Sequence, residues 1–299
     1  MKNKSIKKNY IKDFFSGNNG WLFLIPSILI LFLVMYYPIT YAIGTSFTNM
    51  SIEGANFVGL SNYIEVFKDQ TIIRPLFNTV IYTIFSVFFQ LVLGFFAAYY
   101  LNFKIKGRTI FRTLLLIPWL IPPVVTAMTW QWIYDSHFGV LNSLLFEFHL
   151  IKVYLSWLGD PKLALASVIF VNIWRGYPFM MIMILAGLQA IPREQYEAAN
   201  IDGANNIKQV IFITIPNLKY ILSVAVLLTS IWSFKDFDLV KILTSGGPAG
   251  STEVLSTIVY HTSFKYFDFG RGSTIAVYIL MILLVLSSIY LKASKRQGT

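Results

Sequence analysis

The chain of 299 residues contains no cysteine. Disulfide bridges, thiolate metal sites and cysteine nucleophiles are therefore excluded. Charged residues are also scarce, at 13% of the chain, against about 25% in typical soluble domains. Hydrophobic residues make up 56%. A soluble core of this length could not bury so much apolar side chain, so the bilayer must act as the solvent for much of the molecule.

Sequence signatures of catalysis and metal binding are missing as well. The chain has no Gly-x-x-x-x-Gly-Lys-Ser/Thr loop for nucleotide phosphates, no His-Glu-x-x-His and no Gly-x-Ser-x-Gly elbow. His137, His149 and His261 are scattered over predicted external loops, where solvated side chains are expected rather than a metal site. Ser245-Gly246-Gly247-Pro248 predicts a turn. An enzyme is disfavoured, which leaves a transporter subunit, a channel or an assembly factor.

Long apolar segments dominate the sequence, and each transmembrane helix needs roughly 20 such residues. Six segments qualify: residues 21–47, 76–101, 110–134, 163–189, 218–234 and 273–291. The third segment carries Pro118, Pro122 and Pro123, which predict a kink or a broken helix. The expected fold is therefore an all-α integral membrane protein with six spans.

Charge predicts the orientation of these spans. Residues 1–20, 102–112, 190–219 and 292–299 hold fifteen Lys/Arg and four Asp/Glu, whereas the opposite loops hold eight and ten. Lys and Arg collect in cytoplasmic loops, so both termini are expected in the cytoplasm. The net charge of +10 would hint at nucleic acid in a soluble protein, but here it follows from membrane orientation.

A polar segment at residues 190–217 interrupts the apolar pattern on the predicted cytoplasmic face. Pro192 suits a helix first turn, residues 193–201 are good helix formers, and Gly203 allows a left-handed stop. A second helix is expected over residues 204–213, ended by Pro216. Two small helices with a shallow surface indicate either a docking site for another protein or a helix pair lying on the membrane.

This segment resembles a known signature. Glu197-Ala198-Ala199, then Gly203, then Ile213-Thr214-Ile215-Pro216 resembles the EAA motif of permease subunits of binding-protein-dependent ABC importers, with Ile215 in place of the usual Leu. Other segments resemble the carbohydrate-uptake subfamily, which includes the maltose-type larger permease: residues 21–26, 37–38, 46–48, 62–63, 172–179, 186–189, 237–248 and 269–277. The resemblance covers nearly the whole chain, although the long external insertion and extra N-terminal spans of the maltose permease are missing.

The resemblance implies a type I ABC importer permease fold and a set of partners. A second homologous permease, two ATPase subunits, an extracytoplasmic solute-binding protein and membrane lipid are expected, and nucleic acid is not. The chain itself would be a non-catalytic translocation subunit of the bacterial cytoplasmic membrane, with ATP and Mg on the ATPase. The expected ATPase-coupling residues are Glu197, Ala198, Ala199, Asp202, Gly203 and Ala204.

The family's sugar contacts fall, by motif position, on residues in the third, fourth and fifth predicted spans. They are Trp119, Pro123, Asn172, Arg175, Gly176, Phe179, Trp232, Ser233 and Asp236. Aromatic rings suit the apolar faces of sugars, and polar groups suit their hydroxyls. Helix packing is the alternative role for each aromatic ring, and Pro123 has no hydroxyl to offer.

Arg175 lies inside a predicted span, where a charge is costly and indicates function. It could pair internally with Asp236 or Asp238, reach water at the outer boundary, or bind sugar hydroxyls or a substrate carboxylate. Lys235 and Lys241 add positive charge near the external mouth. The resulting hypothesis is an importer of a sugar or oligosaccharide, with an acidic, uronate-containing cargo as its sharper form. An importer for another solute, such as glycerol phosphate, and a six-span channel or scaffold remain the alternatives.

Overall fold

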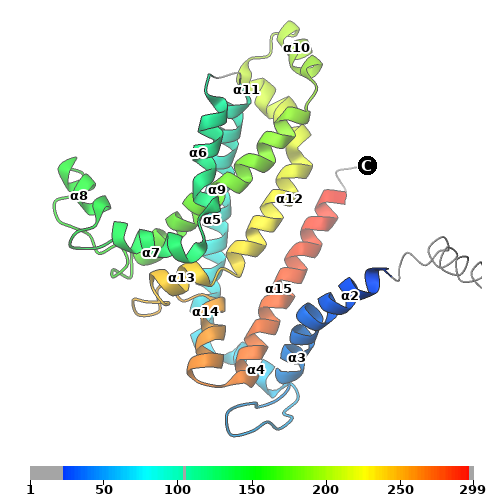
Figure 1. The fold of residues 1–299 in the computed structure, drawn as a ribbon, viewed down its shortest axis with the longest axis vertical. Coiled ribbons are helices and arrows are strands. Elements are labelled where there is room, and N and C mark those ends of the chain that lie inside the picture. The colour runs from blue at the N-terminus through cyan, green and yellow to red at the C-terminus, as the bar shows by residue number, and fades with distance from the viewer. Residues whose placement is uncertain (1–22, 104–105, 296–299) are drawn as a thin grey trace, which may run out of the picture.

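A computed structural model describes residues 23–103 and 106–295, and helices dominate this part of the chain (Figure 1). They are α2 (Ile25–Leu31), α3 (Tyr37–Thr45), α4 (Ser61–Lys68), α5 (Gln70–Asn102), α6 (Arg108–Leu120), α7 (Pro123–Ile133), α8 (Val140–Glu147), α9 (Ala164–Ala190), α10 (Arg193–Ile201), α11 (Asn206–Gln209), α12 (Ile215–Phe234), α13 (Asp238–Leu243), α14 (Leu255–Tyr260) and α15 (Phe269–Lys295). π-Helical turns join α2 to α3 and α11 to α12. The all-α prediction is confirmed, whereas residues 1–20, which are expected to form a cytoplasmic tail, lie outside the described residues.

Five helical stretches in the described residues are long and apolar enough to cross a membrane. They are Ile25–Thr45, Gln70–Asn102, Ala164–Ala190, Asn206–Leu243 and Phe269–Tyr290. A sixth span exists only if α6 and α7 count as one, and these two helices meet at 94°. The break predicted from Pro118, Pro122 and Pro123 is therefore present, and residues 110–134 form two helices rather than one. Ile121 and Pro122 are extended (ψ 130° and 141°), because a residue that precedes proline avoids the α conformation.

The centre of the bundle is formed by α5, α9 and α12, which pack on one another. Met180 and Met181 of α9 are fully buried. Gly94 of α5 lies directly against them, and a Cβ atom at this position would overlap both methionines. A small residue at a helix crossing lets two backbones approach closely, which is how helices associate inside membranes.

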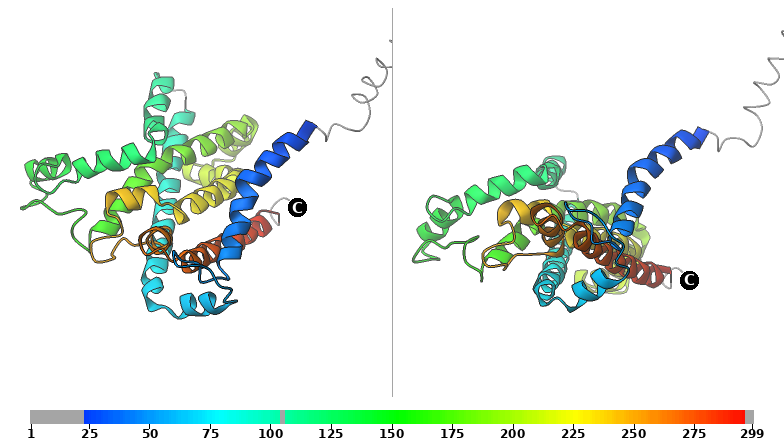
Figure 2. Two further views of the ribbon diagram at one scale, coloured as in Figure 1. Left: turned by 60° about the horizontal axis from the view of Figure 1, so that its bottom comes forward. Right: turned by 90° about the horizontal axis from the view of Figure 1, so that it is seen from below.

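At the end of the bundle away from α10, hydrogen bonds connect the segment after α3 to α4 and α15. Asn62 donates hydrogen bonds to the carbonyl oxygens of Ser46 (3.0 Å) and Thr48 (2.8 Å). The hydroxyl of Thr274 in α15 donates to the same Ser46 oxygen (3.1 Å). The apolar helix Ile25–Thr45 packs on α15 through its α3 half and diverges from the bundle at its α2 end, while α7 and α8 project on another side (Figure 2).

Candidate functional site

A cavity of about 370 Å³ opens between α5, α6, α7, α9 and α12. It brings together eight of the nine residues that the sequence predicts as sugar contacts: Trp119, Pro123, Asn172, Arg175, Gly176, Phe179, Trp232 and Ser233. We refer to it as the central cavity. Asp236 does not line it. Residues far apart in the chain thus converge on one hollow, which makes this the candidate solute site.

Three aromatic rings from three helices form one wall of the central cavity. The ring of Phe179 in α9 lies 4.8 Å from Trp232 in α12 and 6.1 Å from Trp119 in α6, centroid to centroid. Trp119 and Trp232 keep 43% and 41% of their surface exposed. The rings therefore pack on each other and also present free faces, as a sugar-binding wall requires.

The central cavity also has polar lining residues from α5, α9 and α12, and one of them, Gln90, was missed by sequence reasoning. Asn172 donates to the Ser233 hydroxyl (3.2 Å), and the Gln90 side chain donates to the Asn172 carbonyl oxygen (2.9 Å). The Oε1 atom of Gln90 is buried without a partner among the described residues. A Cβ atom on Gly176 would overlap the Gln90 amide, so the glycine makes room for it. An amide in the middle of an otherwise apolar stretch of the second predicted span was the available clue.

Arg175 lines the central cavity and also forms an internal ion pair. Its Nη2 atom lies 3.3 Å from Oδ2 of Asp236, and the Tyr82 hydroxyl donates to the same oxygen (2.9 Å). The Arg175 side chain is 21% exposed and that of Asp236 only 6%. The sequence left Asp236 and Asp238 as possible partners of Arg175. The structure shows the ion pair with Asp236 and none with Asp238. Asp236 thus acts on the cavity through Arg175.

The lysines predicted near the external mouth do not reach the central cavity. Lys241 donates to the Ser245 hydroxyl (2.9 Å) and lies over the Tyr260 ring, 4.4 Å from its centroid. Among the described residues no group of three His, Asp or Glu could hold a metal ion. The expectation that His261 is a solvated surface residue is wrong, because its Nδ1 atom lies 3.2 Å from Glu253 in a largely buried pair.

The second candidate site is the surface of α10 and the turn that follows it. The predicted helix over residues 193–201 is present as α10, and Gly203 adopts the left-handed conformation (φ 74°). The Ala204 amide donates to the Ala199 carbonyl oxygen (2.9 Å), which closes the turn. Glu197, Ala198 and Asp202 are exposed, while Ala199 and Ala204 are half-buried. The six predicted coupling residues therefore lie on one small exposed unit.

Two exposed isoleucines on this unit were missed by sequence reasoning. Ile201 at the end of α10 is 87% exposed, and Ile207 in α11 is 68% exposed. Apolar side chains displayed on a polar loop are typical of a surface that another protein covers. The helical pattern had assigned residue 201 to the helix without showing that it points outward.

The α10 unit is fastened to the base of α12. The hydroxyls of Tyr196 and Thr214 lie 3.0 Å apart, and Asn217 donates to the Gln195 side chain (2.9 Å). The prediction that Pro216 ends the second helix is wrong. The π-helical turn Val210–Thr214 precedes it, with the Ile215 amide bonded to the Val210 oxygen, and this wider turn lets the helix continue through a residue that lacks an N–H group.

Comparison with known proteins supports a single family. The family described as "Binding-protein-dependent transport system inner membrane component" matches residues 90–294. The trehalose/maltose transport system permease protein MalF of Thermococcus litoralis is 34% identical over 92% of this chain and 93% of its own length. The sulfoquinovosyl glycerol transport system permease protein SmoG of Agrobacterium fabrum is 33% identical over 91% and 88%.

Solved structures show the same fold. A chain of a bacterial ABC transporter involved in the import of the acidic polysaccharide alginate superposes with a TM-score of 0.82, covering 98% of this chain and 99% of that chain at 21% identity. At this identity the likeness extends to the fold alone. The expected all-α permease fold is thus confirmed.

Proposed function

Because this chain belongs to the inner membrane components of binding-protein-dependent transport systems, we propose that it is the permease subunit of an ATP-driven importer of a sugar or oligosaccharide. The observation that carries the proposal is the central cavity, where an aromatic wall, two amides and Arg175 meet within one membrane bundle. Sugar sites combine such apolar faces with a few fixed polar groups. The names of the relatives, which specify trehalose, maltose and sulfoquinovosyl glycerol, support a carbohydrate cargo.

The proposed coupling path runs from α10 to the cavity wall along one continuous helix. An ATPase subunit would seat Ile201 and the alanine pair of α10 in a cleft, with Glu197 as a charged contact. Movement of α10 would pass to α12 through Tyr196–Thr214 and Gln195–Asn217. Trp232 and Ser233 lie at the far end of α12, so the ATPase would displace the residues that hold the sugar.

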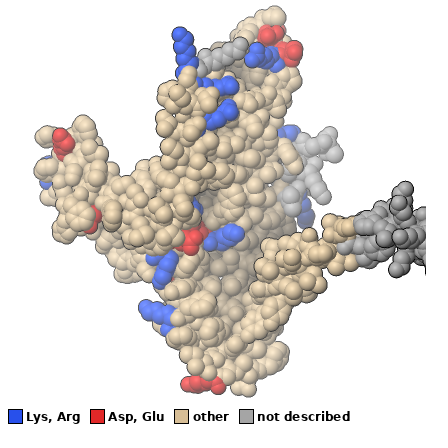
Figure 3. Space-filling model, viewed as in Figure 1, with Lys and Arg blue, Asp and Glu red and all other residues tan. Residues whose placement is uncertain are grey.

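The partners follow from this arrangement. A second, homologous permease would close the open side of the central cavity, and an extracytoplasmic binding protein would deliver the sugar to it. ATP and Mg would bind to the two ATPase subunits, and the chain itself would catalyse no reaction. Both termini and α10 would face the cytoplasm of a bacterium, consistent with the Lys and Arg that gather at the α10 end (Figure 3).

Transport by the reconstituted importer tests this proposal. Trp232→Ala should lower sugar uptake about tenfold or more, because the ring supplies more than the ~1.4 kcal/mol that a factor of ten represents. Trp132→Ala is the matched control, since this ring is 75% exposed and lies outside the cavity. Uptake should then stay within about twofold of wild type. Equal uptake by wild type and Trp232→Ala would remove the central cavity from the transport path.

A further inference from the structure

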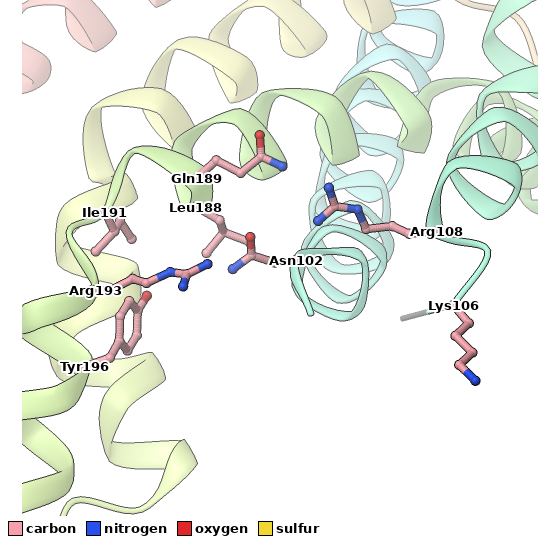
Figure 4. A pocket seen from close by; sticks show the side chains of 8 residues that line it. All are labelled: Asn102, Lys106, Arg108, Leu188, Gln189, Ile191, Arg193 and Tyr196. Carbon is pink, nitrogen blue, oxygen red and sulfur yellow. The ribbon is translucent and has the colours of Figure 1, made fainter. Parts of the chain in front are cut away.

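A second cavity, of about 730 Å³, lies between the ends of α5 and α9 and the starts of α6 and α10. Lys106, Arg108 and Arg193 line it together with two amides and a tyrosine, and none of the described lining residues is a carboxylate. In Figure 4 Arg108 and Arg193 point toward Asn102 from opposite sides, while Lys106 points away. Neither arginine forms an ion pair with a described residue. We refer to this hollow as the lower cavity.

A third arginine lies one helical turn beyond Arg108. The Nε and Nη2 atoms of Arg112 in α6 are buried, and no described residue accepts a hydrogen bond from them. Buried polar groups are almost always paired, and an exception calls for a missing partner such as a water or an ion. For a guanidinium group that partner is an anion or a strong acceptor.

These arginines lie on the face of α6 that carries Trp119. At about 100° per residue, Arg108, Arg112 and Trp119 fall within about 40° of one another around the helix axis, and Arg108 is about 16 Å from Trp119 along it. α5 and α9 also line both cavities. α5 contributes Gln90 to the central cavity and Asn102 to the lower cavity. α9 contributes residues between 172 and 179 to the central cavity and residues 188–189 to the lower cavity. The lower cavity therefore follows the central cavity along the same three helices, toward the α10 end that is at the top of Figure 1.

We propose that Arg108, Arg112 and Arg193 form an anion-binding relay through which the carboxylate or sulfonate of an acidic sugar leaves the central cavity toward the cytoplasm. The proposal rests on the importer function and specifies its cargo class. In the central cavity Arg175 already forms an ion pair with Asp236, whereas no described residue forms an ion pair with Arg108 or Arg193 in the lower cavity. An anion moving inward also works against an inside-negative membrane potential. Several moderate sites in series let an ion enter and still leave.

The general excess of cations on cytoplasmic faces does not account for this cluster. Lys219, near the same end, is exposed and needs no partner beyond water and lipid headgroups. Arg112 has buried unpaired nitrogen atoms, and Arg108 and Arg193 point into a shared hollow. The buried nitrogen atoms of Arg112 and the orientation of Arg108 and Arg193 toward one hollow, rather than the number of cations, indicate a site for an anion.

The test uses the complete importer in phosphatidylcholine vesicles, with two cargoes of equal length: a trisaccharide of uronic acids and its carboxyl-reduced, neutral counterpart. The charge-removing variant is Arg108→Gln with Arg112→Gln, the conservative variant is Arg108→Lys with Arg112→Lys, and Lys219→Gln is the matched control. Loss of one or two charge-assisted contacts should lower uronate transport about tenfold or more. Transport of the neutral sugar, and ATP hydrolysis stimulated by the loaded binding protein, should change less than about twofold. The lysine variant should retain uronate transport within about threefold.

Other outcomes overturn the relay. Equal loss for both sugars would assign the arginines to folding or coupling, and no loss for either would remove them from the path. A defect that appears only in vesicles containing phosphatidylglycerol, and for both sugars, would make the lower cavity a lipid headgroup site. If wild type carries only the neutral sugar, the relay fails and the importer function stands. If it carries neither sugar, the sugar-importer function fails first, and the relay with it.

Discussion

The pair between Arg175 and Asp236 offers the sharpest test of how the central cavity is held together. Asp236→Asn keeps the shape of the side chain but removes its charge. Oδ2 of Asp236 accepts from the Tyr82 hydroxyl at 2.9 Å and from Arg175 at 3.3 Å. The substitution leaves the guanidinium of Arg175 at the cavity wall without its counter-charge.

The size of the effect follows from the geometry. Removing one partner of a buried ion pair costs about 3–5 kcal/mol. Asparagine can still accept from Tyr82, and Arg175 is 21% exposed, so we expect a loss of about 2–3 kcal/mol in the free energy of unfolding. Replacing both residues, as Arg175→Gln with Asp236→Asn, removes the unpaired charge and should cost about 1 kcal/mol or less.

Denaturant unfolding of the purified chain in detergent, followed for wild type, both single variants and the double variant, measures this coupling. Asp238→Asn is the matched control: this carboxylate is exposed and forms no ion pair with a described residue, so its loss should change stability by less than about 0.5 kcal/mol. If the losses of the two single variants simply add in the double variant, Arg175 and Asp236 are not coupled and the reasoning is refuted.

Further predictions concern the core, the α10 surface and an external turn. Gly94→Leu should prevent α5 from packing on α9, which would abolish recovery of folded protein in size-exclusion chromatography, while Gly44→Leu, with open space around the Cβ position, should not. Ile201→Ser should weaken copurification with the ATPase about tenfold without unfolding the chain, since the side chain is 87% exposed and burial of an isoleucine is worth about 1.5–3 kcal/mol. The backbone amides that follow Asp135 donate to its carboxylate and lower its pKa, so the turn is fully stabilised above the ordinary pKa of about 3.9 and loses that support as the pH falls through the lowered value. Hydrogen-exchange protection of His137 and Phe138 should decline on acidification and be unchanged between pH 6 and 8.

The features that were predictable from sequence are those set by local chemistry or by a motif. Apolar length located the spans, and the helix-favouring run before Gly203 located α10 and its left-handed stop. Eight of the residues predicted from motif positions meet in the central cavity. A shared fold brings the same positions together, whatever the role of each side chain.

The features that were missed depend on contacts between distant helices. Gln90 belongs to the cavity only because α5 crosses α9 beside Gly176, and the lower cavity requires α6 and α10 to approach each other. Proline normally ends a helix, and the sequence around Pro216 does not show that the π-helical turn Val210–Thr214 accommodates it. The 94° angle between α6 and α7 is likewise set by packing, since α7 lies against α13, and two prolines specify only that a break occurs.

If the chain is an importer permease, as proposed, the central cavity lined by Ser233 opens alternately to the two sides of the membrane. Because the chain contains no cysteine, Ser233→Cys introduces its single thiol, which can be followed with a membrane-impermeant reagent in the complete importer. We predict labelling from the cytoplasmic side without nucleotide and labelling from the outer side when ATP and the loaded binding protein are present. Labelling should be slower when the transported sugar is added. Labelling that is the same from both sides in every state, or that occurs only with a lipid-soluble reagent, would contradict it.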